Sequence, residues 1–324
     1  MNNQTAFLRN ALKGAAMGIA EVIPGVSGGT IAFITGIYEQ LLNSIKAFGP
    51  GLVRDFREGG IAQVWQRING PFLVSLLAGM ALGIVVGVFT IAHLLENYPP
   101  LVWGFFFGLI IASAIYIGRQ IGTWNVGTGA ALLIGAVVAY GITVITPANG
   151  SESLLFVFFC GAIAISALIL PGISGSFILL LLGMYTYIVT DTLKPALKTL
   201  DPEKLVTVGV FALGCLTGLM TLSRFLSWTF KHYRDLTLAL LTGFMIGSLN
   251  KIWPWRNPTD WLRDDNGQIL MKEDGLTPKK ILMEANVFPG QYDGEPSAIG
   301  VLVLMLLGFA LVFLLERLDR SKML

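Results

Sequence analysis

The chain has 324 residues, of which 54% are hydrophobic and only 13% are charged. Soluble domains carry about 25% charged residues, so this composition excludes an ordinary soluble protein and indicates an integral membrane protein. The formal net charge of +2 argues against a nucleic acid partner. The two cysteines, Cys160 and Cys215, lie in apolar runs, so we expect neither a disulfide nor a metal site.

The first apolar stretch is interrupted between Ala20 and Thr30, where the sequence reads AEVIPGVSGGT. Pro24 removes a backbone donor and clashes with the preceding helical turn. Three glycines near it permit tight turns and close backbone approach: Gly25, Gly28 and Gly29. An irregular backbone at membrane depth is tolerated only where it is buried in protein or lines a wet cavity. We therefore expect a re-entrant helical hairpin over residues 11–45.

Apolar runs after this hairpin have about the 20 residues that a bilayer-spanning helix needs. They predict spanning helices near 71–95, 100–118 and 127–146. A second interruption, ALILPGISGSF, contains Pro171 and Gly172 and predicts a second re-entrant hairpin over 153–190. Three more spanning helices are expected near 205–230, 234–252 and 297–316, with an extracytoplasmic loop over 253–296.

The two interruptions belong to an internal duplication. With a shift of 147 positions, residues 14–38 align with residues 161–185 without gaps, and ten of the 25 positions are identical. The similarity continues at a shift of 135, where Gly79 meets Gly214 and Gly108 meets Gly243. The chain therefore divides into repeats of residues 1–149 and 150–324.

The distribution of Lys and Arg favours an inverted arrangement of the two repeats. Cytoplasmic loops are enriched in these residues. If each motif is re-entrant and the N-terminus is inside, twelve Lys and Arg lie on the cytoplasmic side and three lie in the short outer loops. If each motif spans the membrane, the counts become seven inside and eight outside. We therefore expect an all-α polytopic protein in which each inverted repeat has one re-entrant hairpin and three spanning helices, with both termini in the cytoplasm.

The motifs suggest an anion site near the middle of the membrane. Ser27 and Thr30 follow the first break and can cap the outgoing helix, whose free N–H groups carry partial positive charge. In the second repeat Ser174 is equivalent to Ser27, and Gly175 and Ser176, which are equivalent to Gly28 and Gly29, are candidates beside it. Two such helix ends, entering from opposite sides, would converge near the midplane, as they do in several secondary transporters.

Charged residues within the apolar segments are further candidates. Glu21 has Leu168 as its counterpart in the second repeat, and it can serve proton coupling, stay neutral by burial, or cap free N–H groups. Arg224 suits bidentate phosphate recognition, or it can extend to the cytoplasmic surface. Arg119 ends its helix and is either an anchor or a ligand-binding residue. The sequence contains no metal-binding, nucleophile or Walker A pattern, so no cofactor is expected.

Three segments carry a resemblance to a known family: MGIAEVIPGVSGGTIAFITGIYE, LPGISGSFILLLLGMY, and LSRFL followed by GFMIGSLNKIWPW. They resemble a bacterial membrane family, formerly a domain of unknown function, that is associated with polyprenyl-phosphate transport. The resemblance covers essentially the whole chain. It implies a flippase in the bacterial cytoplasmic membrane that returns undecaprenyl phosphate to the cytoplasmic leaflet for envelope polymer synthesis. The residues that match family motifs are Glu21, Pro24, Gly25, Ser27, Gly28, Gly29, Thr30, Pro171, Gly172, Ser174, Gly175 and Arg224.

Two other functions stay open at the level of sequence. Undecaprenyl-diphosphate phosphatases also use re-entrant hairpins with a PG-S motif, but an arginine follows that serine. Here Gly28 follows Ser27 and Gly175 follows Ser174, so hydrolysis is poorly supported. A small-ion secondary transporter without a lipid substrate is the other alternative. Proton or ion coupling is compatible with Glu21, and the oligomeric state is open.

Overall fold

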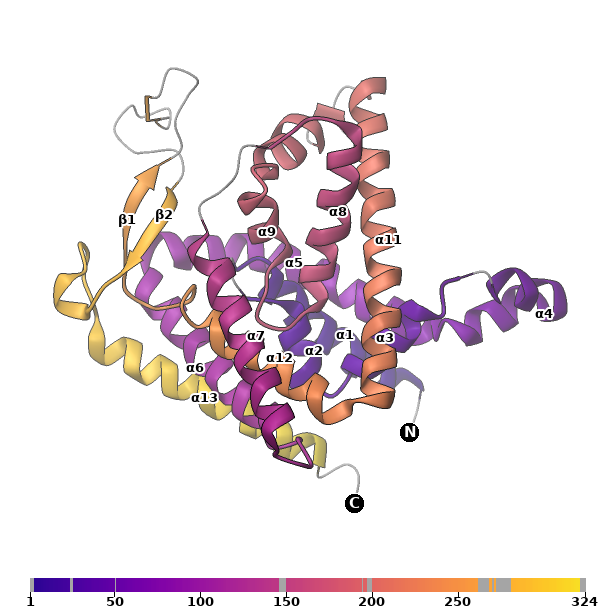
Figure 1. Ribbon diagram of the computed structural model, residues 1–324, viewed down its shortest axis with the longest axis horizontal. Coiled ribbons are helices and arrows are strands. Elements are labelled where there is room, and N and C mark those ends of the chain that lie inside the picture. The colour runs from indigo at the N-terminus through magenta and orange to yellow at the C-terminus, as the bar shows by residue number, and fades with distance from the viewer. Residues whose placement is uncertain are drawn as a thin grey trace.

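The computed structural model describes residues 3–23, 26–49, 51–145, 150–193, 195–196, 200–261, 268–269, 271 and 281–320. The fold is mostly helical (Figure 1). The helices of the first repeat are α1 (Asn3–Glu21), α2 (Gly28–Ile34), α3 (Tyr38–Lys46), α4 (Gly51–Arg67), α5 (Gly70–Asn97), α6 (Pro99–Gly118) and α7 (Val126–Val144). The second repeat contains α8 (Leu154–Ile169), α9 (Gly175–Leu181), the π-helical η1 (Thr186–Leu193), α11 (Pro202–His232), α12 (Arg234–Ser248) and α13 (Ala298–Arg320).

Five described helices are long and apolar enough to cross a bilayer, namely α5, α6, α7, α11 and α13. α12 has 15 residues and is shorter than the predicted segment 234–252, because its helical hydrogen bonding ends at Ser248. At 1.5 Å per residue it extends about 22 Å, less than the hydrocarbon core of about 30 Å. The chain is a multi-pass membrane protein by length and composition of its helices.

Both motifs interrupt a helix in the same way. α1 ends at Glu21 and α2 begins at Gly28, while α8 ends at Ile169 and α9 begins at Gly175. Each short helix is then terminated by a glycine in the left-handed region, Gly36 with φ 70° and Gly183 with φ 69°. Only glycine adopts this conformation without strain from a Cβ atom. A bend of 116° separates α9 from η1.

Close helix contacts repeat between the two halves at equivalent residues. A Cβ on Gly79 of α5 would lie 1.9 Å from the carbonyl oxygen of Ala11 in α1. A Cβ on its counterpart Gly214 of α11 would lie 2.1 Å from the oxygen of Phe158 in α8, and Phe158 is the counterpart of Ala11. Small residues permit such backbone approach between membrane helices. The α1–α5 pair and the α8–α11 pair therefore pack in equivalent registers, which the glycine positions fix.

Two other helix pairs join the repeats to each other. α6 of the first repeat packs along α13 of the second, and α12 of the second packs along α7 of the first. A Cβ on Gly108 would lie 1.9 Å from the Met305 oxygen, and one on its counterpart Gly243 would lie 2.1 Å from the Leu132 oxygen. The larger hydrophobic cluster draws residues from both repeats, whereas a smaller cluster around Val157, Cys160 and Met184 lies within the second repeat.

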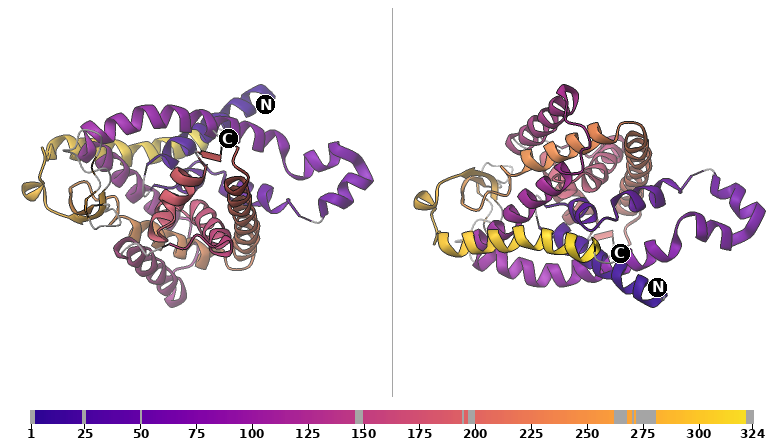
Figure 2. Two further views of the ribbon diagram at one scale, coloured as in Figure 1. Left: turned by 90° about the horizontal axis from the view of Figure 1, so that it is seen from above. Right: turned by 90° about the horizontal axis from the view of Figure 1, so that it is seen from below.

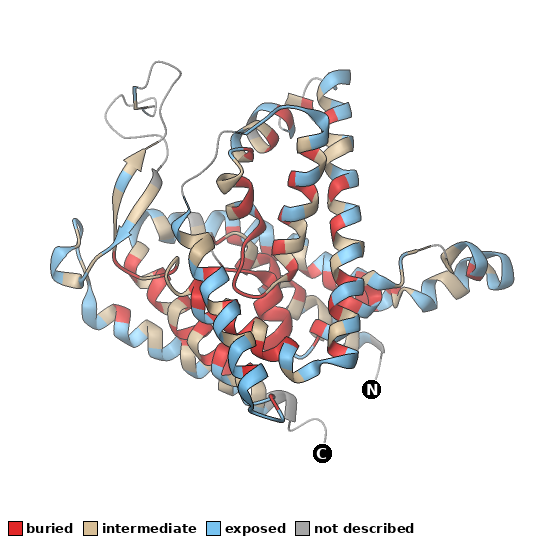
Figure 3. Cartoon of the chain, in the orientation of Figure 1, coloured by how far each residue is buried: buried red, intermediate tan, exposed pale blue. Residues whose placement is uncertain are grey.

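The buried residues gather where α1, α2, α6 and α12 meet, whereas α7, α11 and α13 have many exposed apolar residues (Figure 3). Exposed apolar faces of this kind suit contact with lipid. Two features project from the helical body, α4 at one end and the strands at the other (Figure 2). The first residues of α1 and the last described residues of α13 lie on the same side of the molecule.

The segment 253–296, expected only as a loop, contains an antiparallel pair of strands. β1 (Arg256–Trp261) pairs with β2 (Ile281–Asn286), and the short helix η2 (Pro289–Gln291) follows. The register shifts between Pro258 and Asp260 and again before Trp261. Proline lacks an N–H for the ladder, so irregular pairing is expected beside it. The pair leads from the end of α12 to α13 and places charged residues beside the second motif.

Candidate site at the junction of the two motifs

The two interrupted helices meet inside the protein. The Ser27 hydroxyl donates a hydrogen bond of 2.8 Å to the carbonyl oxygen of Leu168, at the end of α8. The N–H of Gly172 donates to the Thr30 hydroxyl at 3.2 Å. A Cβ on Gly29 would lie 2.3 Å from the oxygen of Ile169, so only glycine fits there. These contacts define the motif junction; Pro24 and Gly25, also expected in it, lie outside the described residues.

The serine and threonine of the first motif are closed to solvent. Ser27 and Thr30 are each 0% exposed, and the Ser27 oxygen also accepts the N–H of Gly29 at 3.0 Å. Each of these two hydroxyl groups therefore has a hydrogen-bond partner within the protein. These two residues hold the junction together, and neither faces a cavity in this conformation.

Glu21 occupies the helix end that the sequence suggested for an anion. Its Oε1 accepts the first N–H of α2, that of Gly28, at 2.6 Å. A carboxylate is stabilised at this end of a helix because the free N–H groups carry partial positive charge. A Cβ on Gly28 would lie 2.7 Å from the same oxygen, so glycine is needed for the approach. Of the roles considered for Glu21, capping of α2 is the one seen in the geometry.

The second motif is built differently at the equivalent place. Leu168 stands where the first motif has Glu21, and it packs beside Gly175. The hydroxyl groups of Ser174 and Ser176 lie 2.9 Å apart. Ser174 is 1% exposed, whereas Ser176 is exposed and lines a cavity. The second motif therefore connects the junction to an open space through this pair of hydroxyl groups.

Pro171 and Gly172 form the turn of the second motif, and both are buried. Gly172 has φ 85°, and a Cβ there would lie 3.0 Å from the Cα of Met245 in α12. Both the backbone conformation and the close approach require glycine.

The two predicted arginines lie away from the junction. The Nη2 of Arg224 donates to the carbonyl oxygen of Phe48, beyond the end of α3, at 3.0 Å. Arg119 follows α6, is exposed, and places its guanidinium 5.3 Å from the centre of the Phe313 ring. The structure thus brings Glu21, Ser27, Thr30 and the second motif together and leaves both arginines at the surface.

A cavity of about 500 Å³ opens beside the second motif. Its lining includes Ser176, Phe177 and Tyr185 from the second motif and the segment after it, together with Lys251 and Arg256. We call it the Lys251 cavity. Glu284 and Asp293 also line it, so its charges are balanced, although no described ion pair joins Asp293 to either cation.

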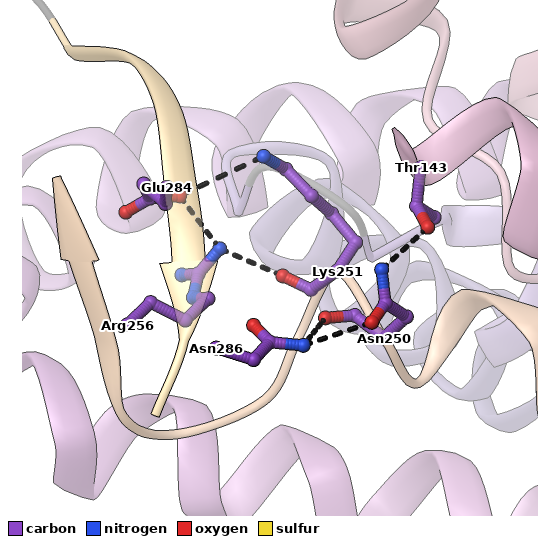
Figure 4. A network of polar contacts seen from close by, with 6 residues as sticks. All are labelled: Thr143, Asn250, Lys251, Arg256, Glu284 and Asn286. Atoms are coloured by element: carbon purple, nitrogen blue, oxygen red, sulfur yellow. Dashed lines mark hydrogen bonds and ion pairs between the residues drawn. The ribbon is translucent and has the colours of Figure 1, made fainter. Parts of the chain in front are cut away.

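A polar network holds the cations of the Lys251 cavity in place (Figure 4). The Nη1 of Arg256 donates to Glu284 Oε2 at 2.8 Å and to the Lys251 carbonyl oxygen at 2.7 Å. The Nζ of Lys251 lies 3.6 Å from the same carboxylate oxygen. Asn286 donates to Asn250 at 2.8 Å, which ties β2 to the end of α12. Strand pairing therefore positions the charged residues beside the cavity.

An aromatic ring also contacts each of the two cations. Arg256 lies 4.2 Å from the centre of the Trp103 ring, and Lys251 lies 4.8 Å from that of Phe177. Burial lowers the pKa of Lys251, and the nearby Glu284 carboxylate partly offsets this effect. Burial also lowers the pKa of Arg256, and Glu284 again acts in the opposite direction. Anionic ligands that enter the cavity would meet cations that are poorly hydrated, which strengthens their electrostatic interaction.

Lys251, Arg256 and Glu284 were not predicted from the sequence. The two cations flank the WPW sequence, and tryptophans near the end of a spanning helix are ordinary interface anchors that point to no ligand. The signal that could have identified them is the position of the two cations, since Lys251 lies two residues before Trp253 and Arg256 follows Trp255 directly. Glu284 lies in a segment whose charges are mixed, so its pairing with them depends on the β1–β2 register and has no local signature.

The duplicated, interrupted helices and the long apolar helices around them place the chain among polytopic membrane proteins. The family model described as undecaprenyl phosphate translocase-like matches residues 17–270, and the chain belongs to this family. The polyprenyl-phosphate transporter of Vibrio cholerae serotype O1 is 43% identical over 315 residues, which cover 96% of each chain. The polyprenyl-phosphate transporter of Staphylococcus aureus is 33% identical over 263 residues, 76% of this chain and 86% of the relative. No solved structure matches the chain.

Proposed function

We propose that this protein carries polyprenyl phosphate, in particular undecaprenyl phosphate, across the bacterial cytoplasmic membrane. Family membership and the two relatives named as polyprenyl-phosphate transporters support the substrate. The observation that carries the proposal is the hydrogen-bonded motif junction, with a cavity beside it whose lining includes Ser176, Lys251 and Arg256. The phosphate would travel past the junction while the polyprenyl chain stays in lipid, against the exposed apolar faces of the spanning helices.

The proposal includes an inverted arrangement of the two repeats. Each motif enters and leaves on one side as a re-entrant hairpin, and three further helices of each repeat cross the membrane. The reciprocal pairing of α6 with α13 and of α12 with α7 supports the equivalence of the repeats. Two observations support cytoplasmic termini. Lys and Arg are concentrated on the side predicted to be cytoplasmic, and the start of α1 and the described end of α13 lie on the same side of the molecule.

The binding residues then have separate roles. Ser176, Lys251 and Arg256 bind the phosphate in the Lys251 cavity, on the extracytoplasmic side. Ser27 and Thr30 close the junction, and movement of the motifs would expose their hydroxyl groups to the phosphate. Arg224 and Arg119 meet the phosphate at the membrane surface, consistent with their exposed positions.

Glu21 is the proposed site of coupling to a proton. Protonation of its carboxyl group would weaken the charge-assisted hydrogen bond to Gly28 and release the start of α2. Leu168 occupies the equivalent position in the second motif, so only one hairpin would respond.

The geometry favours transport over hydrolysis. The Ser27 hydroxyl is buried and donates to a backbone carbonyl, so the described contacts give it no base that would activate it as a nucleophile. Purified protein supplied with undecaprenyl diphosphate should release no phosphate above background. Turnover in this assay would support the phosphatase alternative.

The proposed function is tested in cells that lack their own carrier transporters. Surface-exposed undecaprenyl phosphate, measured with a reagent that does not enter the cell, should fall when this protein is expressed. A Lys251→Ala/Arg256→Ala variant present at the same level should leave it high. Equal surface exposure with and without the wild-type protein would contradict the proposal.

A further inference from the structure

We infer that a groove between α1, α2, α6 and α13 is a second binding site for the lipid phosphate, on the other face of the motif junction. This inference rests on the proposed function and deepens it, because it assigns where the substrate binds on the cytoplasmic side. The groove encloses about 420 Å³. We call it the Arg9 groove.

The walls of the Arg9 groove are almost entirely apolar. They include Ala16 and Ile19 of α1, Ile34 of α2, Phe106 of α6 and Leu311 of α13. Leu12, at the edge, is 63% exposed, so the groove opens on the outer surface of α1. A hydrocarbon chain can therefore enter from the side and bury apolar surface, which stabilises its binding by about 25 cal/mol per Å².

Two cations stand at one end of these walls. Arg9 and Lys13 are four residues apart on α1, so they lie on the same face of the helix. Lys13 donates to the carbonyl oxygen of Thr35, at the end of α2, which keeps its ammonium beside the groove. The buried Nε of Arg9 has no hydrogen-bond partner within the described ranges.

The charge of the Arg9 groove differs from that of the Lys251 cavity. The residues found to line the groove include both cations and no carboxylate, whereas Glu284 and Asp293 line the cavity. An apolar channel that ends in a net positive charge is complementary to a lipid with one hydrocarbon chain and an anionic head. The unsatisfied guanidinium donor fits a phosphate oxygen, since Arg binds phosphate through several N–H groups.

The two spaces are arranged around the same helices. Pro99 and Trp103 of α6 line the Lys251 cavity, and Phe105, Phe106 and Leu109 of α6 line the Arg9 groove. The cavity touches the second motif at Ser176, and the groove touches the first motif at Ile31. Each motif thus has its own space, and the buried junction separates them. We assign the groove to polyprenyl monophosphate as it is released towards the cytoplasmic leaflet.

The test is photo-crosslinking of the full chain in nanodiscs of phosphatidylcholine, with a photoreactive polyprenyl monophosphate as the probe. Labelled peptides of wild-type protein should include α1 residues of the Arg9 groove. The Arg9→Ala/Lys13→Ala variant should reduce this labelling at least tenfold, and Arg9→Lys should retain part of the labelling that Arg9→Ala loses. Arg54→Ala is the matched control, because Arg54 lies on α4, where it pairs with exposed Glu58.

A steric variant guards against loss of folding. Ala16→Trp fills the groove and retains both cations, so it should also abolish labelling of α1 while the protein still elutes as a single species. Unchanged labelling in both variants would overturn the inference. Equal competition by phosphatidylglycerol and by unlabelled polyprenyl phosphate would identify a general anionic-lipid site and also overturn it.

The outcome is separable from that of the proposed function. A wild-type protein that transports, together with an Arg9→Ala/Lys13→Ala variant that binds and transports equally well, contradicts only this inference. A wild-type protein without any transport contradicts the proposed function, whatever the labelling shows.

Discussion

At the scale of single residues, hydroxyl groups that look equivalent in sequence have different environments. Ser27 bridges the two motifs and is fully buried, whereas Ser176 is exposed in the Lys251 cavity. Glu21 is bound to the first N–H of α2 and has no counterpart in the second motif. The sequence identified these residues as a set, but it could not divide them into those that hold the junction and those that line the cavity.

The Ser27→Ala and Ser176→Ala variants form a matched pair that tests this division. Ser27→Ala leaves the Leu168 carbonyl and the Gly29 N–H without their partner, so it should lower the free energy of unfolding by about 1–3 kcal/mol. Ser176→Ala should change it by less than about 0.5 kcal/mol and should instead weaken lipid phosphate binding. Thermal unfolding in detergent and a binding titration measure the two effects. Equal loss of stability in both variants would contradict the assignment.

Glu21 predicts a pH dependence of transport. If its protonation releases α2, the wild-type transport rate changes with pH, and Glu21→Gln gives a rate that is independent of pH. The glutamine oxygen still accepts the Gly28 N–H, so stability should be nearly retained. Glu21→Ala should cost about 0.5–2 kcal/mol, as loss of a helix cap does. A wild-type rate that is constant over the pH range of stable folding would refute coupling through Glu21.

Lys251 predicts a second, separate pH effect on binding in the Lys251 cavity. Because burial lowers its pKa, its ammonium loses a proton at a lower pH than an ordinary lysine. The affinity for polyprenyl phosphate should therefore fall as pH rises through this lowered pKa. Lys251→Arg should extend binding to higher pH, since arginine stays protonated. Titrations at alkaline pH, where the phosphate is already a dianion, compare the two proteins; coincident curves would show that Lys251 does not bind the ligand.

At the scale of helices and strands, the lengths of the apolar runs and the positions of the two helix breaks were sufficient to predict most of the membrane helices. The extents of α5, α6, α7, α11 and α13 follow the apolar runs closely, because long uncharged segments have few alternatives in a bilayer. The charged α4, which contains Gly59 and Gly60, and the β1–β2 pair were not predicted. Both depend on local turns and tertiary contacts that leave no clear hydrophobic period.

The glycine contacts provide a prediction about helix packing. Gly79→Ala and its counterpart Gly214→Ala each place a Cβ about 2 Å from a carbonyl oxygen of the neighbouring helix, so both should destabilise the fold by at least about 1–3 kcal/mol. Gly209→Ala is the control, since a Cβ there meets nothing within 4 Å. It should be neutral or stabilise α11 by up to about 1 kcal/mol. Thermal unfolding of the three variants decides, and a tolerated Gly79→Ala would contradict the packing.

At the scale of the whole molecule, the repeats are joined in two ways. Reciprocal helix pairs bind them along their lengths, and the motif junction binds them at the centre. The Lys251 cavity and the Arg9 groove lie on different motifs and share α6. The proposed transport requires a relative movement of the repeats that opens one space as it closes the other. Duplication was visible in the sequence, whereas these spaces depend on helix pairing across the repeats.

We propose above that this chain moves polyprenyl phosphate between the leaflets of the membrane. This proposal is tested most directly with purified protein in liposomes that contain polyprenyl phosphate, by following how fast the lipid becomes accessible to a phosphate-specific reagent added only outside. We predict rapid exchange with wild-type protein, and slow exchange with the Lys251→Ala/Arg256→Ala variant at equal reconstitution. Exchange by the wild-type protein that is no faster than in protein-free liposomes would contradict the claim.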